Sequence, residues 1–396
     1  MTSFASAAAV LGGLLLLGAL LSGIARRSFV SLVALFVLAG FVLGTGGIGV
    51  LKLRAGSGLV TDLADVALIV ILFRDGLEVD RGALARDWHL PLRKLAIGMP
   101  VTAAVVAALA RLLVGLDWTE AFLLGALLSP TDPVLSSGVV TDSRVPSSIR
   151  QSLNLESGLN DGLALPAVLA FAAALEPGRG SFEWWQFVIQ DIGLGLVFGL
   201  VCGMVGSLLL PRADGEHALP AHQLTLYGIG LAFATYGLAV LPPHGNGFIA
   251  VFVAAIVTGV RRKDLRHAFG ERSEELAEIV KLGIFAVFGS LLTVDGLFSS
   301  GWGAVAVVAG TFLLARPLAV WIALAGSRLP NASKAFMAWF GPKGVATMTF
   351  SLLVLSRDVE AGAKIFDIAA LTVFVSIIAH GATETPGIEW IARRPP

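Results

Sequence analysis

Charged residues are scarce in this chain. Only 14% of its 396 residues are Asp, Glu, Lys or Arg, whereas 56% are hydrophobic. A water-soluble domain of this length could not cover so much apolar surface, so the composition excludes that class and predicts a polytopic membrane protein. The 28 basic and 28 acidic residues cancel. No electrostatic case remains for a nucleic-acid partner.

Cysteine is almost absent as well. The single cysteine, Cys202, excludes an intramolecular disulfide and a cysteine-based metal cluster. The first apolar run lacks a preceding basic residue and a convincing small-residue cleavage site, so we expect it to be retained rather than removed as a signal peptide. We expect no enzymatic activity and no cofactor.

Long apolar runs dominate what is present. A helix of roughly 20 apolar residues crosses a hydrocarbon core of about 30 Å. We therefore predict an all-α polytopic membrane protein with about thirteen transmembrane helices. The expected spans lie near residues 4–24, 28–46, 58–77, 92–114, 119–140, 150–175, 184–210, 222–240, 247–262, 274–297, 300–325, 333–356 and 365–385.

The basic residues are distributed unevenly between alternate loops. If the N-terminus lies outside, seventeen of the 28 Lys and Arg residues fall in inward-facing loops, Arg93 and Lys94 among them, and six fall in outer loops. The positive-inside rule then predicts an outer N-terminus and a cytoplasmic C-terminus. The remaining basic residues lie in or beside spans: Arg74, Arg272, Lys281, Arg316 and Lys343.

Two of the expected spans contain helix breakers. "LLGALLSPTDPVLSSGVV" is interrupted by Pro130 and Pro133, and "FMAWFGPKGVATMTF" by Gly341, Pro342 and Gly344. A transporter built from inverted repeats places its broken helices at matching positions in the two halves. We therefore predict a single membrane domain, 1–396, made of two inverted six-helix repeats, about 4–176 and about 222–385, joined by a helix at about 184–210. The alternative is that proline merely kinks two ordinary helices.

Ionisable residues accompany both breaks. Asp132 before Pro133 is the arrangement that begins a helix, with Asp as N-cap and Pro in the first turn. We expect a half-helix to begin there in mid-membrane, with Asp132 offsetting its positive end and Thr131 offering a neutral oxygen to a hard cation. Lys343 follows the other break and can offset a half-helix C-terminus. An N-cap at the membrane surface is the alternative for Asp132.

The stretch "SLNLESGLNDGLALPAV" carries two carboxylates inside an expected span. Such charges are costly in a bilayer, so each should face a cavity or a partner. Ser157 and Asp161 lie four residues apart on one helical face, and Glu156 and Asn160 lie four apart on a neighbouring face. Because Glu156 and Asp161 point in different directions, we expect them to have different functions.

Arg316 supplies a partner for one of these carboxylates. It stands in the middle of the apolar run "TFLLARPLAVWIALA", where a guanidinium requires a carboxylate. Pairing Glu156 with Arg316 leaves Asp161 without a permanent countercharge, so that a proton and a cation can compete for it. Pairing Arg316 with Asp161, with Glu156 near a helix end, is the alternative.

The motifs "SPTDPV", "ESGLNDG", the in-span "ARP" and "GPKG" together resemble those of sodium/proton antiporters of the monovalent cation:proton antiporter superfamily. The resemblance covers essentially the whole chain, and the Asn160-Asp161 pair is similar to that of the electroneutral branch. It implies that Asp161 binds the exchanged ion, Asn160 stabilises the core, and Glu156 and Arg316 form an ion pair. The remaining implied cation ligands are Thr131, Ser157 and Asp132. Lys343 stands where an arginine is more usual in this branch.

The resemblance also implies a partner, a location and a transport cycle. It implies a homodimer with a dimerisation domain and a mobile core domain in a prokaryotic cell membrane, serving pH homeostasis. The expected activity is electroneutral one-to-one exchange of H⁺ for Na⁺ or Li⁺, with K⁺/H⁺ exchange as the alternative on the same scaffold. Glu78 and Asp80 are expected either to attract cations into an inward funnel or simply to be a solvated helix end.

Two other classes of protein remain as alternatives. A non-transporting sensor or channel could use the same scaffold. An intramembrane aspartyl protease could use Asp132 and Asp161, although its usual Gly-x-Gly-Asp motif is absent.

Overall fold

The structure is a computed structural model of the chain, and every regular element that it describes is a helix. It describes residues 12, 13, 16, 32–54, 56–79, 89–132, 137–176, 183–211, 219–242, 244–357 and 359–394, with the side chains of 32 and 271–277 excepted. The expected first span, 4–24, lies almost wholly outside these residues. The prediction of an all-α protein is confirmed.

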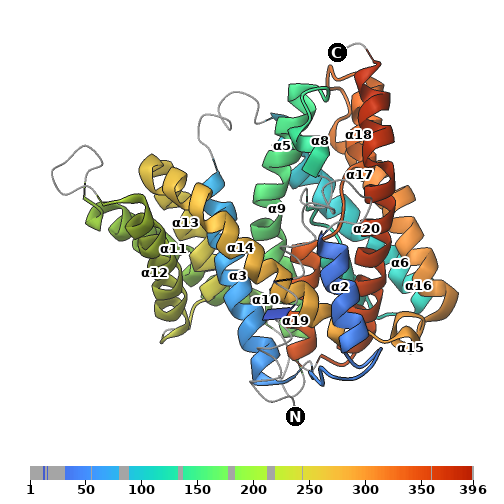
Figure 1. Ribbon diagram of the computed structural model, residues 1–396. Helices are drawn as coiled ribbons and strands as arrows, with labels where there is room; N and C mark the ends of the chain where they lie inside the picture. The colour runs from blue at the N-terminus through green and yellow to red at the C-terminus, as the bar shows by residue number, and fades with distance from the viewer. Residues whose placement is uncertain are drawn as a thin grey trace.

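The described helices follow one another along the chain as Figure 1 shows. The α-helices are α2 (Leu32–Leu43), α3 (Gly58–Glu78), α5 (His89–Arg93), α6 (Met99–Val114), α7 (Trp118–Leu127), α8 (Ser137–Thr141), α9 (Ser147–Ala174), α10 (Trp184–Gln186), α11 (Leu194–Leu209), α12 (Ala221–Val240), α13 (Gly247–Arg261), α14 (Lys263–Leu291), α15 (Val294–Leu297), α16 (Gly301–Gly310), α17 (Arg316–Ala323), α18 (Asn331–Trp339), α19 (Val345–Ser356) and α20 (Gly362–Ala392). Short π-helical segments η1 (Lys94–Gly98), η3 (Phe187–Gly193) and η4 (Thr311–Ala315) join α5 to α6, α10 to α11, and α16 to α17.

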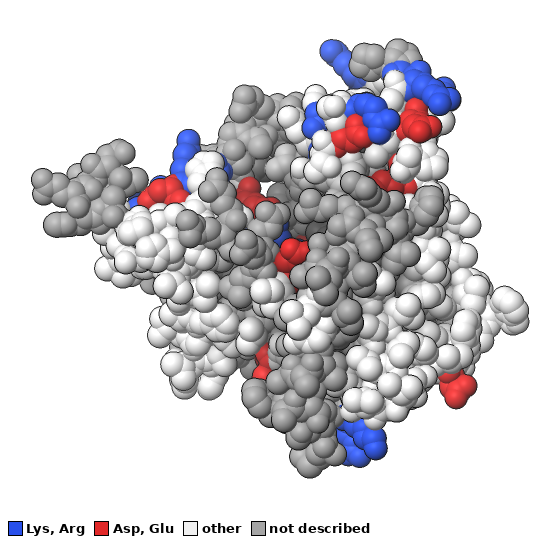
Figure 2. All heavy atoms as spheres, viewed as in Figure 1, with Lys and Arg blue, Asp and Glu red and all other residues white. Residues whose placement is uncertain are grey.

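Several of these helices can cross a membrane. Within the described residues, six continuous helical stretches are long and apolar enough to do so, and four further apolar helices are shorter. Figure 2 shows charged side chains gathered at the upper and lower ends of one face, with uncharged residues over most of the area between them. Large apolar side chains such as Leu112, Leu208 and Trp302 are exposed. This distribution suits a protein surrounded by lipid.

Helices α11, α12 and α13 lie together at one side of the molecule, while α9 runs through its middle (Figure 1). Gly195, Gly199 and Gly203 follow one another four residues apart along α11 and face α13. A side chain at Gly199 would come within 2.6 Å of the Ala250 carbonyl oxygen. The glycine row therefore permits close contact between helices, as is common in membrane proteins.

One expected helix boundary needs revision. The span expected near 274–297 begins earlier, because α14 extends from Lys263 to Leu291. The two expected breaks do occur: α7 ends at Leu127 before a non-helical segment, and residues 340–344 separate α18 from α19. Pro133 lies outside the described residues.

Candidate ion-binding site

The first break, of which the structure describes residues 128–132, lies against the second break, residues 340–344, in the interior. The backbone N–H of Asp132, in the first break, donates to the carbonyl oxygen of Pro342, in the second, at 2.8 Å. Thr347, on the first turns of α19, donates its hydroxyl to the Leu127 carbonyl at the end of α7 at 3.1 Å. Segments more than 200 residues apart in the chain therefore satisfy each other's unpaired backbone groups.

Each break also supplies a charge to the helix end of the other. Lys343 Nζ donates to the carbonyl oxygens of Ser129 at 3.2 Å and Pro130 at 2.9 Å, just beyond the end of α7. Asp132 Oδ2 accepts from the backbone N–H of Val345, the first residue of α19, at 2.9 Å. Both contacts place a charge where it opposes the helix dipole. The ammonium of Lys343 thus lies at the C-terminal end of α7.

Residues 133–136 lie outside the described part of the chain, so the expected role of Asp132 as cap of its own second half-helix stays a prediction. The carboxylate hydrogen-bonds to α19, a helix of the other half of the chain. The local Asp-Pro signal could not predict the contact with α19, because only the tertiary fold brings Val345 to Asp132.

Helix α20 contacts both ends of the second break. Ser376 Oγ accepts from the backbone N–H of Lys343 at 2.7 Å, and His380 Nε2 lies 3.0 Å from the Trp339 carbonyl oxygen at the end of α18. Ser376 Oγ also lies 3.2 Å from His380 Nδ1. His380 Nδ1 also lies 2.9 Å from the Ser376 carbonyl oxygen, so each ring nitrogen faces a backbone carbonyl, and one neutral tautomer can donate to only one of them. Both ends of the break are thereby fixed.

Asn160 connects α9 to the first break. Its Nδ2 donates to the Thr131 carbonyl oxygen at 2.8 Å and to Thr131 Oγ1 at 3.0 Å. The amide therefore fixes the non-helical segment beside Asp161. Thr131 and Ser157 also line a void of about 10 Å³, large enough for one water molecule, next to Pro342.

Glu156 lies in a buried cluster with two cations. Arg316 Nη1 contacts Glu156 Oε1 at 2.5 Å, and Arg316 Nη2 contacts Oε2 at 3.1 Å. Lys94 Nζ contacts the same Oε2 at 2.6 Å and donates to the Ser152 carbonyl oxygen at 3.2 Å. The side chains of Lys94 and Glu156 are 0% and 1% exposed. A single buried carboxylate thus contacts two buried basic side chains.

The place of Lys94 corrects the sequence interpretation. It was counted with Arg93 among the residues of an inward-facing loop, but it lies in η1, inside the continuous helical stretch His89–Val114. The correction leaves the inward excess of basic residues in place. Sequence reasoning missed Lys94 because it stands at the end of its apolar run, where a lysine usually extends to water.

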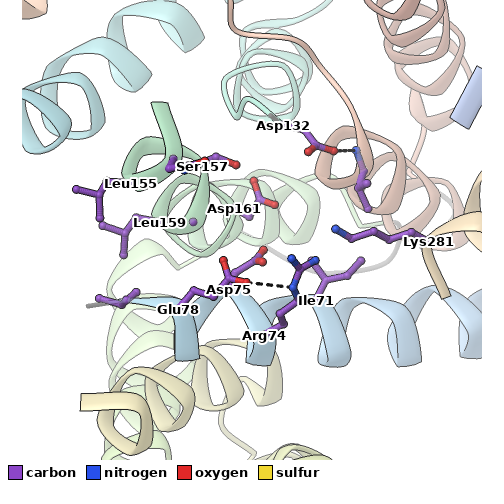
Figure 3. A pocket seen from close by; sticks show the side chains of 14 residues that line it. Ile71, Arg74, Asp75, Glu78, Asp132, Leu155, Ser157, Leu159, Asp161 and Lys281 are labelled. Atoms are coloured by element: carbon purple, nitrogen blue, oxygen red, sulfur yellow. Dashed lines mark hydrogen bonds and ion pairs between the residues drawn. The ribbon is translucent and has the colours of Figure 1, made fainter. Parts of the chain in front are cut away.

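Asp161 faces a cavity of about 390 Å³ lined by residues of α3, α9, α14 and the first break (Figure 3). Only 8% of the residue is exposed, and among the described residues no group hydrogen-bonds to its Oδ1. Ser157 and Asp132, two of the other expected ligands, line the same cavity. An unpartnered carboxylate oxygen in such a cavity can take either a proton or a hard cation.

Three further charged residues line this cavity, and sequence reasoning assigned no role to any of them: Arg74, Asp75 and Lys281. Asp75 extends from α3 and Lys281 from α14, and in Figure 3 both side chains point toward the space below Asp161. Asp75 borders the apolar run 66–73 of α3 and Lys281 borders the apolar run 282–288 of α14, a signal that could have marked them as candidates. Their position opposite Asp161 depends on how α3, α9 and α14 pack together.

The expected funnel residues lie at the edge of the cavity. Glu78 lines it with a half-exposed side chain and forms an ion pair with Arg74 at 3.2 Å. Asp80 lies outside the described residues. Within the described part of the chain, no cluster of three or more His, Cys, Asp or Glu side chains is suited to a resident metal ion.

The family model for "Sodium/hydrogen exchanger, transmembrane" matches residues 13–390, nearly the whole chain. The chain belongs to this sodium/hydrogen exchanger family. Membership identifies an integral membrane transport protein with multiple spans rather than an enzyme, as the sequence motifs predicted.

Solved structures of sodium/hydrogen exchangers share the complete fold. The structure of the sodium proton antiporter MjNhaP1 from Methanocaldococcus jannaschii at pH 8 matches with a TM-score of 0.83 and 19% identity. The match covers 98% of this chain and 99% of that one. At this identity the likeness shows the common fold.

Curated relatives of this exchanger are named for different ions. The K(+)/H(+) antiporter NhaP2 of Shewanella oneidensis is 26% identical over 92% of this chain. The K(+)/H(+) antiporter NhaP of Alkalimonas amylolytica is 26% identical over 96% of the chain. The Na(+)/H(+) antiporter 2 of Zygosaccharomyces rouxii is 29% identical over 45% of it. The match spans 63% of the Shewanella protein and 66% of the Alkalimonas protein.

Proposed function

We propose that the protein exchanges a monovalent cation for H⁺ across the membrane, with Asp161 as the group that binds each in turn. The observation that carries this proposal is the unpartnered Oδ1 of Asp161 in a cavity beside the two breaks. A proton and a cation cannot both occupy one carboxylate oxygen, so loading from one side releases the other ion. Asp132 and Ser157 line the same cavity and complete the proposed ligand set, with Thr131 behind Ser157.

The exchanged cation is Na⁺ or Li⁺ in this proposal, with K⁺ as the second candidate. The solved relative named above is a sodium proton antiporter, while the relatives that match over most of the chain are named K(+)/H(+) antiporters. All three ions are hard monovalent cations that carboxylate and hydroxyl oxygens can bind. Selection among them depends on cavity size and ligand number.

The proposed cycle is alternating access by a homodimer. The two halves, about 4–176 and about 222–385 around the helix at about 184–210, would be inverted repeats that place their broken helices at one site. The reciprocal contacts between Asp132 and α19 and between Lys343 and the end of α7 support this arrangement. We place the N-terminus outside and the C-terminus in the cytoplasm because of the inward excess of basic residues.

The test is exchange by the purified protein in proteoliposomes that hold a pH gradient. Addition of Na⁺, Li⁺ or K⁺ in turn should dissipate the gradient with at least one of them, and choline should not. Clamping the membrane potential at different values should leave the rate unchanged if exchange is one to one. A gradient that persists with every alkali cation contradicts the proposal, whereas potential-dependent rates contradict only the stoichiometry.

A further inference from the structure

The carboxylates that line the cavity differ in the positive group that offsets their negative charge. Glu78 forms an ion pair with Arg74, and Asp132 accepts from the first N–H of α19, where the helix dipole offsets its charge. Asp75 and Asp161 remain, and among the described residues of the lining Lys281 is the one further ionisable residue. The ammonium of Lys281 therefore decides how many uncompensated negative charges the cavity holds.

Lys281 is held by charge rather than by a fixed contact. Among the described residues it forms no hydrogen bond or ion pair, and its side chain extends from α14 into the cavity between Asp75 and Asp161 (Figure 3). Its ammonium therefore attracts the carboxylates that share this lining, Asp75 among them. Asp75 and Asp132 share the same lining with Asp161, and their negative charges repel its charge.

We propose that Lys281 neutralises Asp75 and thereby leaves Asp161 as the single exchangeable charge of the cavity. This inference rests on the proposed antiport and adds a reason for its one-to-one stoichiometry. One proton or one monovalent cation then makes the cavity neutral, which lowers the cost of moving the loaded site through the membrane. Lys281 and Asp75 act as positioning residues, because they set the electrostatic potential at Asp161 without requiring contact with the transported ion.

The pairing predicts opposite effects for the two single substitutions. In Lys281→Gln, the charge of Asp75 adds to that of Asp161, so the KM for the cation should fall about tenfold at fixed pH. In Asp75→Asn, the ammonium of Lys281 is left to repel the cation, so the KM should rise about tenfold. The double variant Asp75→Asn with Lys281→Gln restores the net charge, and its KM should return to within about threefold of the wild-type value.

The experiment measures the KM for Na⁺, Li⁺ and K⁺ from the dissipation of a pH gradient in proteoliposomes. Lys364→Gln makes the same chemical change at a residue that bonds to the Val114 carbonyl, far from the cavity lining, and should leave the KM unchanged. Lys281→Met provides a second charge-removing variant if the glutamine variant folds poorly. Lys281→Arg, which keeps the charge, should shift the KM less than Lys281→Gln does.

The outcomes separate this inference from the proposed function. If wild-type protein exchanges a cation but both Lys281 variants leave the KM unchanged or raise it, the inference is wrong and the antiport stands. The inference would also be overturned if the KM of the double variant were no closer to the wild-type value than the KM of Asp75→Asn alone. If the wild type exchanges no cation, the proposed function fails, and cation affinity is measured instead as the thermal stabilisation of the detergent-solubilised protein by added cation. The inference then predicts the tightest binding for Lys281→Gln and the weakest for Asp75→Asn.

Discussion

Glu156 and Asp161 lie five residues apart on one helix, and both are buried, yet their surroundings differ completely. Glu156 contacts Arg316 through both oxygens and also contacts Lys94. Asp161 has an oxygen for which the described residues provide no hydrogen bond, and it faces the cavity. Burial alone therefore does not identify a transport residue. A carboxylate that is saturated by partners stabilises the structure, whereas one left unsatisfied can exchange ions.

The largest expected effect comes from removing the unsatisfied carboxylate. Asp161→Asn leaves no titratable group at the site, so we expect cation-driven proton movement to fall by at least about 100-fold. Proteoliposome exchange measures the rate, and thermal unfolding should show little loss of stability. Normal exchange by this variant would remove the functional distinction between the two carboxylates.

Removing Glu156 should instead damage the fold. Glu156→Ala leaves Arg316 and Lys94 buried without a countercharge, and we expect a loss of about 3–5 kcal/mol of stability. The measurement is unfolding of the detergent-solubilised protein. The triple variant Glu156→Gln, Arg316→Met and Lys94→Met removes all three charges and should recover much of this loss. A triple variant no more stable than Glu156→Ala would contradict the cluster.

Asn160 extends the comparison, because we expect its loss to reduce both stability, as at Glu156, and exchange, as at Asp161. Asn160→Ala removes both hydrogen bonds to Thr131 and leaves a buried carbonyl and hydroxyl with fewer partners, so we expect a loss of about 1–3 kcal/mol. Its exchange should weaken but remain independent of membrane potential. Gln151→Ala, an exposed amide on the same helix, is the matched control. Equal stability of the two variants would show that the Thr131 contacts contribute little.

The smallest effect is expected at an exposed carboxylate. The side-chain hydrogen bond from Arg144 lowers the pKa of Asp142 to about 2, so this group stays ionised throughout the physiological range. Its contribution to stability is lost only as the pH falls through that value. Asp142→Asn should therefore leave the exchange rate unchanged between about pH 6 and 9. A shifted pH profile would show that exposed carboxylates also take part in proton supply.

The sequence determined the class of this protein and much of the candidate site. The sequence shows apolar runs of membrane length, the two Pro/Gly breaks, and the charged residues Glu156, Asp161 and Arg316. These residues can be recognised as candidates because an ionisable or helix-breaking residue inside a membrane span carries a cost in free energy. Helical spacing alone separated Glu156 from Asp161, because a difference of five residues turns them to different sides of the helix.

Only the tertiary structure decided which groups meet. Asp132 bonds to α19, in the other half of the chain, and Lys94 joins Glu156 from a position that the sequence assigned to a loop. Asp75 and Lys281 come from helices about 90 and 120 residues away from Asp161 in the chain, and only packing brings them to one cavity. A local sequence pattern shows that a charge inside a membrane span is unfavourable and needs a partner. Which residue becomes that partner depends on contacts between segments that are distant in the chain.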